Sequence, residues 1–120
     1  MVTVKAQSGD IAKTQTDAIV VNLLDGVKSP GGGTGAVDQA MDGAISALIA
    51  DKEITGKQGE ITLLHTLGKI PAKRVVVVGL GKREKFTAET VRSISAVVAR
   101  YLRRIGVRRA ATIAHGAGIG

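Results

Sequence analysis

A glycine-rich stretch in the first third of the sequence has the composition of a phosphate-binding loop. Residues 17–23 form an apolar run, and Pro-Gly-Gly-Gly-Thr-Gly-Ala follows at 30–36, before a helical pattern. Glycines at such a junction let a phosphate approach the backbone, and the free amides of a helix N-terminus attract anions. We therefore expect any ligand to contact this stretch. Its candidate ligand-binding residues are Gly31, Gly32, Gly33, Thr34 and Gly35.

The known nucleotide-binding motifs do not fit this stretch. Gly31-x-Gly33-x-x-Ala36 matches the dinucleotide fingerprint formally, but about seven residues separate it from the apolar run. The fingerprint needs its first glycine at the end of the strand. The later pair Gly79-x-Gly81 lacks a third glycine and is predicted to be a tight turn. No Gly-Lys pair has the flanking residues of a P-loop.

Residues typical of catalysis are few. The chain has no cysteine and two histidines, His65 and His115, which we interpret as structural or surface residues near strand ends. No His-Glu-x-x-His sequence occurs, and the second half has no cluster of carboxylates for a metal site. Asp38 and Asp42 fall in the first two turns of a predicted helix, where negative charge is ordinary. These features favour a binding or assembly module without its own metal or cofactor over a self-sufficient enzyme.

Positive charge is concentrated in the second half of the chain. The net charge is +7, with five Lys against eight Asp or Glu in residues 1–60 and twelve Lys or Arg against two Glu in 61–120. A cluster of arginines at the end of a predicted helix either complements the helix dipole or contacts an anionic partner, such as DNA or an acidic neighbouring domain. With one Tyr, one Phe and no Trp, stacking on single strands is disfavoured. The candidate contacts are Arg100, Arg103, Arg104, Arg108 and Arg109.

The hydrophobic periodicity predicts strands that alternate with helices. Strands are expected at residues 2–6, 17–23, 61–65, 74–79 and 110–114, with Gly79-Leu80-Gly81 ending the fourth. One helix is expected from Ala36 past Leu48, with the Thr34 hydroxyl near its N-cap. A second is expected between an N-cap at Thr87 and a stop at Gly106.

This order of elements indicates an α/β fold with a largely parallel sheet, in one domain over residues 1–120. Ligands of such folds gather at the carboxyl ends of the strands. Glycine-rich segments follow strands at 31–35, 79–81 and 116–120, and because nothing follows the last, we expect a fragment of a longer protein. The chain has no apolar run of about 20 residues and no signal-peptide pattern, so no membrane contact and a cytoplasmic location are expected.

Several segments resemble the N-terminal domain of the M17 family of leucyl aminopeptidases. They are Asp-Ala-Ile-Val-Val-Asn-Leu at 17–23, Gly-Gly-Gly-Thr-Gly-Ala-Val-Asp at 31–38, Asp-Gly-Ala-Ile at 42–45, Arg-Val-Val-Val-Val-Gly-Leu-Gly-Lys at 74–82, Phe-Thr at 86–87 and Arg-Arg-Ile-Gly-Val-Arg-Arg-Ala at 103–110. Their order and spacing cover most of the chain.

That resemblance implies a three-layer, macro-like α/β/α domain joined to a C-terminal metallopeptidase domain, in a cytoplasmic enzyme that is usually a homohexamer. In that family the two divalent metal ions (Zn, Mn or Mg) and the catalytic residues belong to the C-terminal domain. The Asn-Thr-Asp-Ala-Glu-Gly-Arg signature of that domain is absent from this chain, so no catalytic residue is assigned and no peptidase activity is expected from residues 1–120 alone.

A second resemblance is to macro domains that bind ADP-ribose. Gly9-Asp10-Ile11, the strand at 17–20 and the triple glycine at 31–33 are similar to the macro pattern. By that analogy Asp10 would receive the adenine amino group, the glycine amides would hold the diphosphate, and Asn22 would stand where the family has several asparagines. Leu23 and Leu24 follow Asn22, which departs from the pattern at the distal ribose.

The leading expectation is therefore an accessory domain that packs on its own catalytic domain, builds the oligomer and restricts access to the active sites. The alternatives are a binder of ADP-ribose or a related nucleotide, and a domain that contacts duplex DNA through its basic second half.

Overall fold

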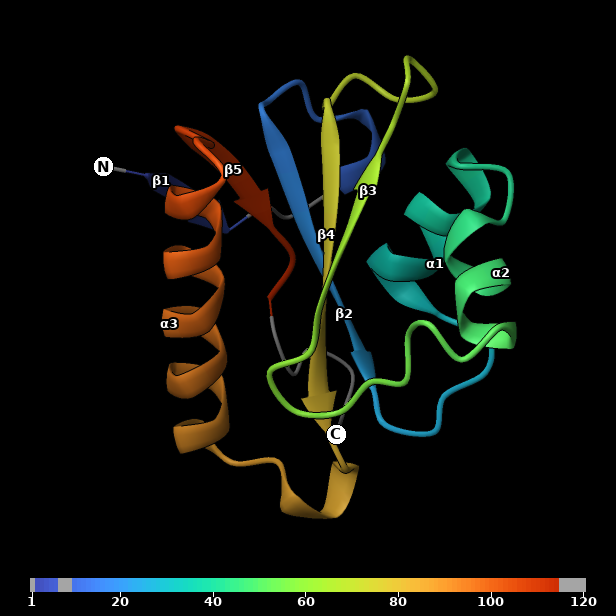
Figure 1. Ribbon diagram of the computed structural model, residues 1–120, viewed down its shortest axis with the longest axis vertical. Coiled ribbons are helices and arrows are strands. Elements are labelled where there is room, and N and C mark those ends of the chain that lie inside the picture. The colour runs from blue at the N-terminus through green and yellow to red at the C-terminus, as the bar shows by residue number, and fades with distance from the viewer. Residues whose placement is uncertain (1, 7–9, 115–120) are drawn as a thin grey trace.

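Five strands form one sheet in the order β1-β5-β2-β4-β3 (Figure 1). This computed structural model describes residues 2–6 and 10–114. Neighbouring strands are parallel except for β3, which pairs with β4 in antiparallel orientation. The predicted α/β class with a largely parallel sheet is confirmed. The strands are β1 (Thr3–Ala6), β2 (Ala18–Leu24), β3 (Ile61–His65), β4 (Arg74–Gly81) and β5 (Arg109–Thr112).

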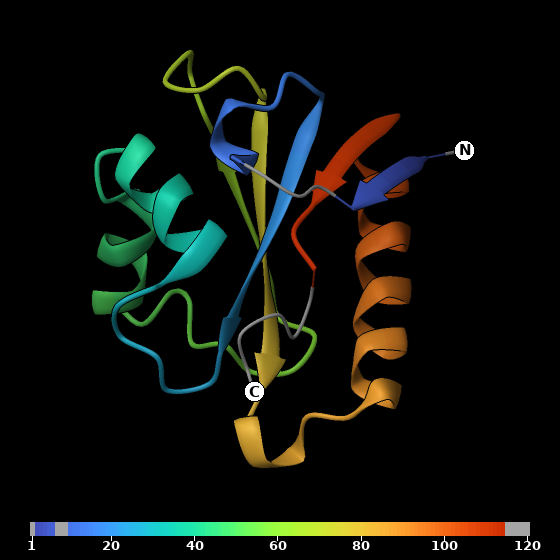
Figure 2. The same ribbon diagram turned by 180° about the vertical axis from the view of Figure 1, so that it is seen from behind.

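Helices cover both faces of the sheet and make three layers (Figures 1 and 2). One face carries α1 (Gly32–Ala40), α2 (Ala44–Ala50) and the short 3-10 helix η1 (Ile11–Lys13). The other carries α3 (Ala88–Arg104), which η2 (Arg83–Lys85) joins to β4. Successive residues of β2 point to opposite faces, so Ile19 packs toward α1 and Val20 toward α3, and both are fully buried. The continuous apolar run of this strand follows from burial on both faces.

Local signals define α3, and the prediction for it is confirmed. Thr87 is its N-cap and exchanges hydrogen bonds with Thr90 in a capping box. Three residues at helical spacing, Ile94, Val98 and Leu102, bury the inner face. Gly106, with φ at +81°, follows the C-cap residue Ile105, whose carbonyl accepts a 3.0 Å bond from the Arg74 guanidinium.

The first helix begins earlier than the sequence predicted. It starts at Gly32, so the glycines form its first turn, and the N-cap is Gly31, not a residue near Thr34. The reason is tertiary packing, which periodicity does not reveal. A Cβ at Gly33 would lie 2.8 Å from Cγ2 of Ile113, and a Cβ at Gly35 would lie 2.6 Å from the carbonyl oxygen of Pro30. Glycines let this turn pack closely against Ile113, which follows β5, and against the preceding loop.

The prediction of a single helix is also wrong, because this part of the chain forms two helices, α1 and α2. Gly43 has φ at +79° and is the N-cap of α2 without a side-chain cap. The carboxylate of Asp38 replaces that cap by accepting from the backbone N (2.8 Å) and the hydroxyl of Ser46. Asp38 therefore lies near the end of α1 and serves the start of α2, instead of lying in the first turns of one long helix.

The expected turn at 79–81 is wrong as well, since β4 continues through Gly81. Its ladder with β2 runs from Ala18 opposite Arg74 to Leu24 opposite Gly81, with a register shift between Leu23 and Leu24. A Cβ at Gly79 would lie only 1.9 Å from the carbonyl oxygen of Lys57. The glycine is needed because another segment crosses the strand there, not because the strand turns.

Two further observations complete the fold. Within residues 2–6 and 10–114, no helix has the length and apolar character needed to cross a bilayer. Some of the predictions concern Gly9, His115 and the glycine-rich segment 116–120, which lie outside the described residues.

Candidate functional site

The first turn of α1 presents backbone amides at the carboxyl end of β2. Gly31 caps the helix without a side-chain hydrogen bond, and the first helical bond runs from the Gly35 amide to the Gly31 carbonyl at 2.9 Å. The amides of Gly32, Gly33 and Thr34 therefore precede the helical ladder. Amides in this position attract anions, which is the chemistry that the glycine-rich stretch predicted.

The Thr34 side chain is turned inward to β2. Its hydroxyl donates to the Asn22 carbonyl at 2.7 Å and accepts from the Asn22 amide at 3.2 Å, and the residue is 3% exposed. The register of β5 with β2 runs only to Val20, so Thr34 satisfies backbone groups of β2 beyond that point. The structure thus brings Thr34 and Asn22 together. Ligand contact by either residue stays a prediction.

Asp10 lies on the element that packs against the glycine-rich turn. It is the N-cap of η1, where its carboxylate accepts from the Ala12 amide at 3.1 Å. The next residue, Ile11, is buried, and its Cγ2 would be 3.5 Å from a Cβ at Gly33. η1 therefore places exposed Asp10 near the start of α1. A contact between Asp10 and an adenine remains untested.

The five arginines gather at the opposite end of the sheet. Arg100, Arg103 and Arg104 are exposed on the last turns of α3, and Arg108 and Arg109 are exposed at the start of β5, beside that helix end (Figure 1). Within the described residues, none of the five forms an ion pair with a carboxylate. Their charge is available to an anionic partner.

Asp17 ties this end of the sheet together. Its carboxylate accepts from the backbone amides of Arg108 at 3.2 Å and Arg109 at 3.1 Å. The start of β5 is thereby held beside the start of β2. Asp17 acts on the backbone of these arginines and leaves their guanidinium groups exposed.

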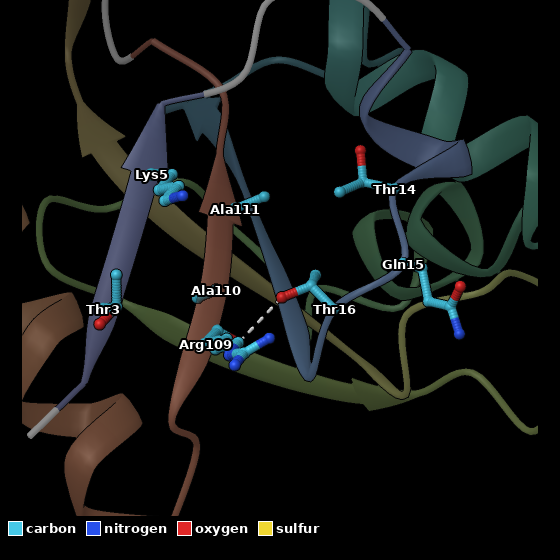
Figure 3. A pocket seen from close by; sticks show the side chains of 8 residues that line it. All are labelled: Thr3, Lys5, Thr14, Gln15, Thr16, Arg109, Ala110 and Ala111. Atoms are coloured by element: carbon cyan, nitrogen blue, oxygen red, sulfur yellow. Dashed lines mark hydrogen bonds between the residues drawn. The ribbon is translucent and has the colours of Figure 1, made fainter.

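A groove that sequence reasoning missed lies between β1 and the segment leading into β2 (Figure 3). Its volume is about 480 Å³. Its two cations, Lys5 and Arg109, are far apart along the chain and become neighbours only because β1 pairs with β5. The lining residues are Thr3, Lys5, Thr14, Gln15, Thr16, Arg109, Ala110 and Ala111.

A partly buried hydrogen-bond cluster around Glu60 was also missed. The Glu60 carboxylate accepts from the Thr55 amide (2.9 Å), the Thr55 hydroxyl (2.7 Å) and the Gly56 amide (3.0 Å). Burial raises the pKa of this carboxyl, but the bonds from Thr55 and Gly56 outweigh burial and set the pKa below its usual value of 4.5. The cluster fixes the segment that crosses the carboxyl ends of β2 and β4, where Gly81 donates to the Gly56 carbonyl at 2.8 Å.

The donors needed for a metal do not assemble in the part of the chain that the structure describes. No three His, Asp or Glu residues there come close enough together to bind an ion. His65 is exposed at the end of β3, consistent with a surface residue. The family resemblance places its two metal ions in the C-terminal domain, whose signature this chain lacks.

Sequence comparison finds a family that covers most of the chain. The model of the cytosol aminopeptidase family, N-terminal domain, matches residues 19–115. A probable cytosol aminopeptidase of Geobacter sulfurreducens is 42% identical over 79 residues, which cover 66% of this chain and 16% of that protein. A probable cytosol aminopeptidase of Alkaliphilus metalliredigens is 38% identical over 104 residues, which cover 87% of this chain and 20% of that protein. The chain thus spans about a fifth of the length of these curated relatives.

Structural comparison gives the same fold in two kinds of protein. A variant of tomato leucine aminopeptidase matches with a TM-score of 0.71 and 19% identity, over 100% of this chain and 24% of that one. The macrodomain of Mycobacterium tuberculosis DarG matches with a TM-score of 0.69 and 18% identity, over 98% of this chain and 81% of that one. At these identities the similarity shows the fold alone.

Proposed function

We propose that this chain, which belongs to the cytosol aminopeptidase family and matches the N-terminal domain of that family, is the accessory domain of a longer metal-dependent aminopeptidase. In this role it packs on its own C-terminal catalytic domain, builds the homohexamer and restricts access to the active sites. The match of residues 19–115 to the N-terminal domain model carries the proposal.

The proposal assigns catalysis to the rest of the longer protein. The two divalent ions (Zn, Mn or Mg) supply hydrolytic chemistry in the catalytic domain, and no step of that chemistry is routed through residues 1–120. The name of the relatives, cytosol aminopeptidase, supports a cytoplasmic location for the longer protein.

Deletion of this domain tests the accessory role. The full-length protein and a variant lacking residues 1–120 would be compared by light scattering, and for hydrolysis of leucine p-nitroanilide and of an unfolded protein. We expect the deletion to lower the oligomeric mass and to raise the rate on the large substrate relative to the small one. Unchanged mass together with an unchanged ratio of rates would contradict the proposal.

A second candidate, binding of ADP-ribose or a related nucleotide, is favoured by one observation. The amides of Gly32, Gly33 and Thr34 precede the helical ladder at the carboxyl end of the parallel sheet, where such folds bind ligands. Calorimetric titration of the chain with ADP-ribose tests it. Heat that saturates at a 1:1 ratio would support this candidate, and no heat at millimolar ADP-ribose would remove it.

Contact with duplex DNA is the third candidate, and the exposed arginines at the end of α3 and the start of β5 favour it. Each phosphate contact adds to the salt dependence of binding. Neutralising Arg103, Arg104 and Arg108 together should weaken DNA binding and flatten its dependence on salt. Binding that is insensitive to salt would contradict this candidate.

A further inference from the structure

The groove between β1 and residues 14–16 lies on the α1 face of the sheet, where no helix among the described residues covers β1 and β5, while α3 covers β5 on the other face. Figures 1 and 2 show α1 and α2 over the half of the sheet that is away from β1, and all four residues of β1 are exposed. The floor is formed by β5, where Ala111 contributes only a methyl group (Figure 3). At about 480 Å³ the groove has the size of small-molecule sites in proteins.

Two cations lie on the same face of the paired strands that line this groove. Thr3 is opposite Arg109 and Lys5 is opposite Ala111, so Lys5 and Arg109 are diagonal neighbours. With ordinary spacings within and between strands, their Cα atoms are roughly 8 Å apart. Neither side chain forms an ion pair with a residue that the structure describes.

The rest of the lining consists of neutral donors and small side chains. It contains no carboxylate among the described residues. Thr16 donates its hydroxyl proton to the Arg109 carbonyl at 3.1 Å and thereby joins the wall formed by residues 14–16 to the floor formed by β5. The lining also includes the neutral side chains of Thr3, Thr14 and Gln15. The carboxylate of Asp17, next to Arg109 in space, is already bonded to the amides of Arg108 and Arg109.

We propose that this groove binds a small organic anion that carries two oxyanion groups, phosphate or carboxylate, one contacted by Lys5 and the other by Arg109. With Cα atoms roughly 8 Å apart, the two long side chains can each contact one group of such a ligand. The charge-assisted bonds that it would form are the stronger class of hydrogen bonds. The ligand would bridge β1, an edge strand, to β5. Binding would therefore stabilise the strand that has the least burial in the sheet.

Titration of the 120-residue chain tests this site directly. Backbone amide resonances would be followed by NMR during addition of pyrophosphate in one series and succinate in another, at constant ionic strength. We expect saturable shifts at Thr3, Lys5, Gln15 and Arg109 with at least one of the two anions. The anion that binds identifies whether phosphate or carboxylate is the preferred group.

Two variants and one matched control distinguish a specific anion-binding site from non-specific electrostatic attraction of anions to the protein. Lys5→Gln and Arg109→Gln should each weaken binding by at least about tenfold. Lys85→Gln, which removes one positive charge from an exposed position on η2, should leave the affinity within about twofold. The unchanged resonances of the core would verify that each variant is folded.

Three results would overturn the proposal. They are the absence of saturable shifts with both anions, an equal loss of affinity in Lys85→Gln, and shifts confined to the amides of residues 31–35. The last result would place the anion at the start of α1 and leave the β1–β5 groove without a ligand.

Discussion

At the carboxyl end of the parallel sheet polar groups bond to the protein itself, whereas at the amino end charged side chains lie exposed. Thr34 satisfies the backbone of Asn22, and Glu60 satisfies Thr55 and Gly56. At the other end the side chains of Arg108 and Arg109 extend from a backbone that Asp17 holds. The difference indicates that the glycine-rich end is built for close packing, whereas the arginine-rich end leaves its positive charges exposed to solvent.

The largest expected effect comes from filling the space at Gly79. Gly79→Ala would place a Cβ 1.9 Å from the Lys57 carbonyl oxygen, so the crossing segment must move. We expect a loss of about 3 kcal/mol in the free energy of unfolding, measured by urea denaturation. Gly31→Ala is the matched control, because no atom lies within 4 Å of its Cβ position, and it should cost less than about 1 kcal/mol. Equal losses would contradict the role given to close packing.

Removing the Thr34 hydroxyl should have the next largest effect. Thr34→Val keeps the shape but leaves the amide and carbonyl of Asn22 without this partner, at a cost of about 2 kcal/mol. Thr34→Ser retains the hydroxyl and should lose less than Thr34→Val. Thermal unfolding of the three proteins checks the order, and a valine variant as stable as the wild type would show that this bond is dispensable.

A gain in stability is expected at the amino end. Leu67, in the turn between β3 and β4, is 88% exposed and has φ at +52°, next to Gly68 at +87°. Asparagine adopts this conformation more readily than leucine, so Leu67→Asn should raise the free energy of unfolding by about 0.5–1 kcal/mol. Leu67→Ala has the same backbone strain and should bring no comparable gain. A loss of stability in Leu67→Asn would mean that the leucine side chain contributes packing.

The smallest expected effect is the pH dependence from Glu60. Its pKa is lowered in the folded state, so its contribution is present above the unfolded pKa, near 4.5, and is lost as the pH falls through the folded pKa. In Glu60→Gln the urea midpoint should therefore change less between pH 6 and pH 3 than in the wild type. Identical pH profiles for the two proteins would show that the cluster does not favour the carboxylate.

The elements of this fold also differ in how closely the sequence predicts them. β3 and α3 were predicted closely because period, capping residues and the stop at Gly106 are local signals. The start of α1 was missed because it depends on the contact of Gly33 with Ile113, 80 positions away. The same holds for Gly79, which needs the Lys57 carbonyl to explain it, and for the groove, which exists only when β1 and β5 pair. Tertiary contacts of this kind leave no periodic pattern in the sequence.

The central claim, that this chain is the accessory domain of a longer aminopeptidase, is tested most directly by sequencing the transcript across codon 120. We predict an open reading frame that continues into a domain with the Asn-Thr-Asp-Ala-Glu-Gly-Arg signature. A stop codon directly after Gly120 would contradict the claim and favour an independent binding module.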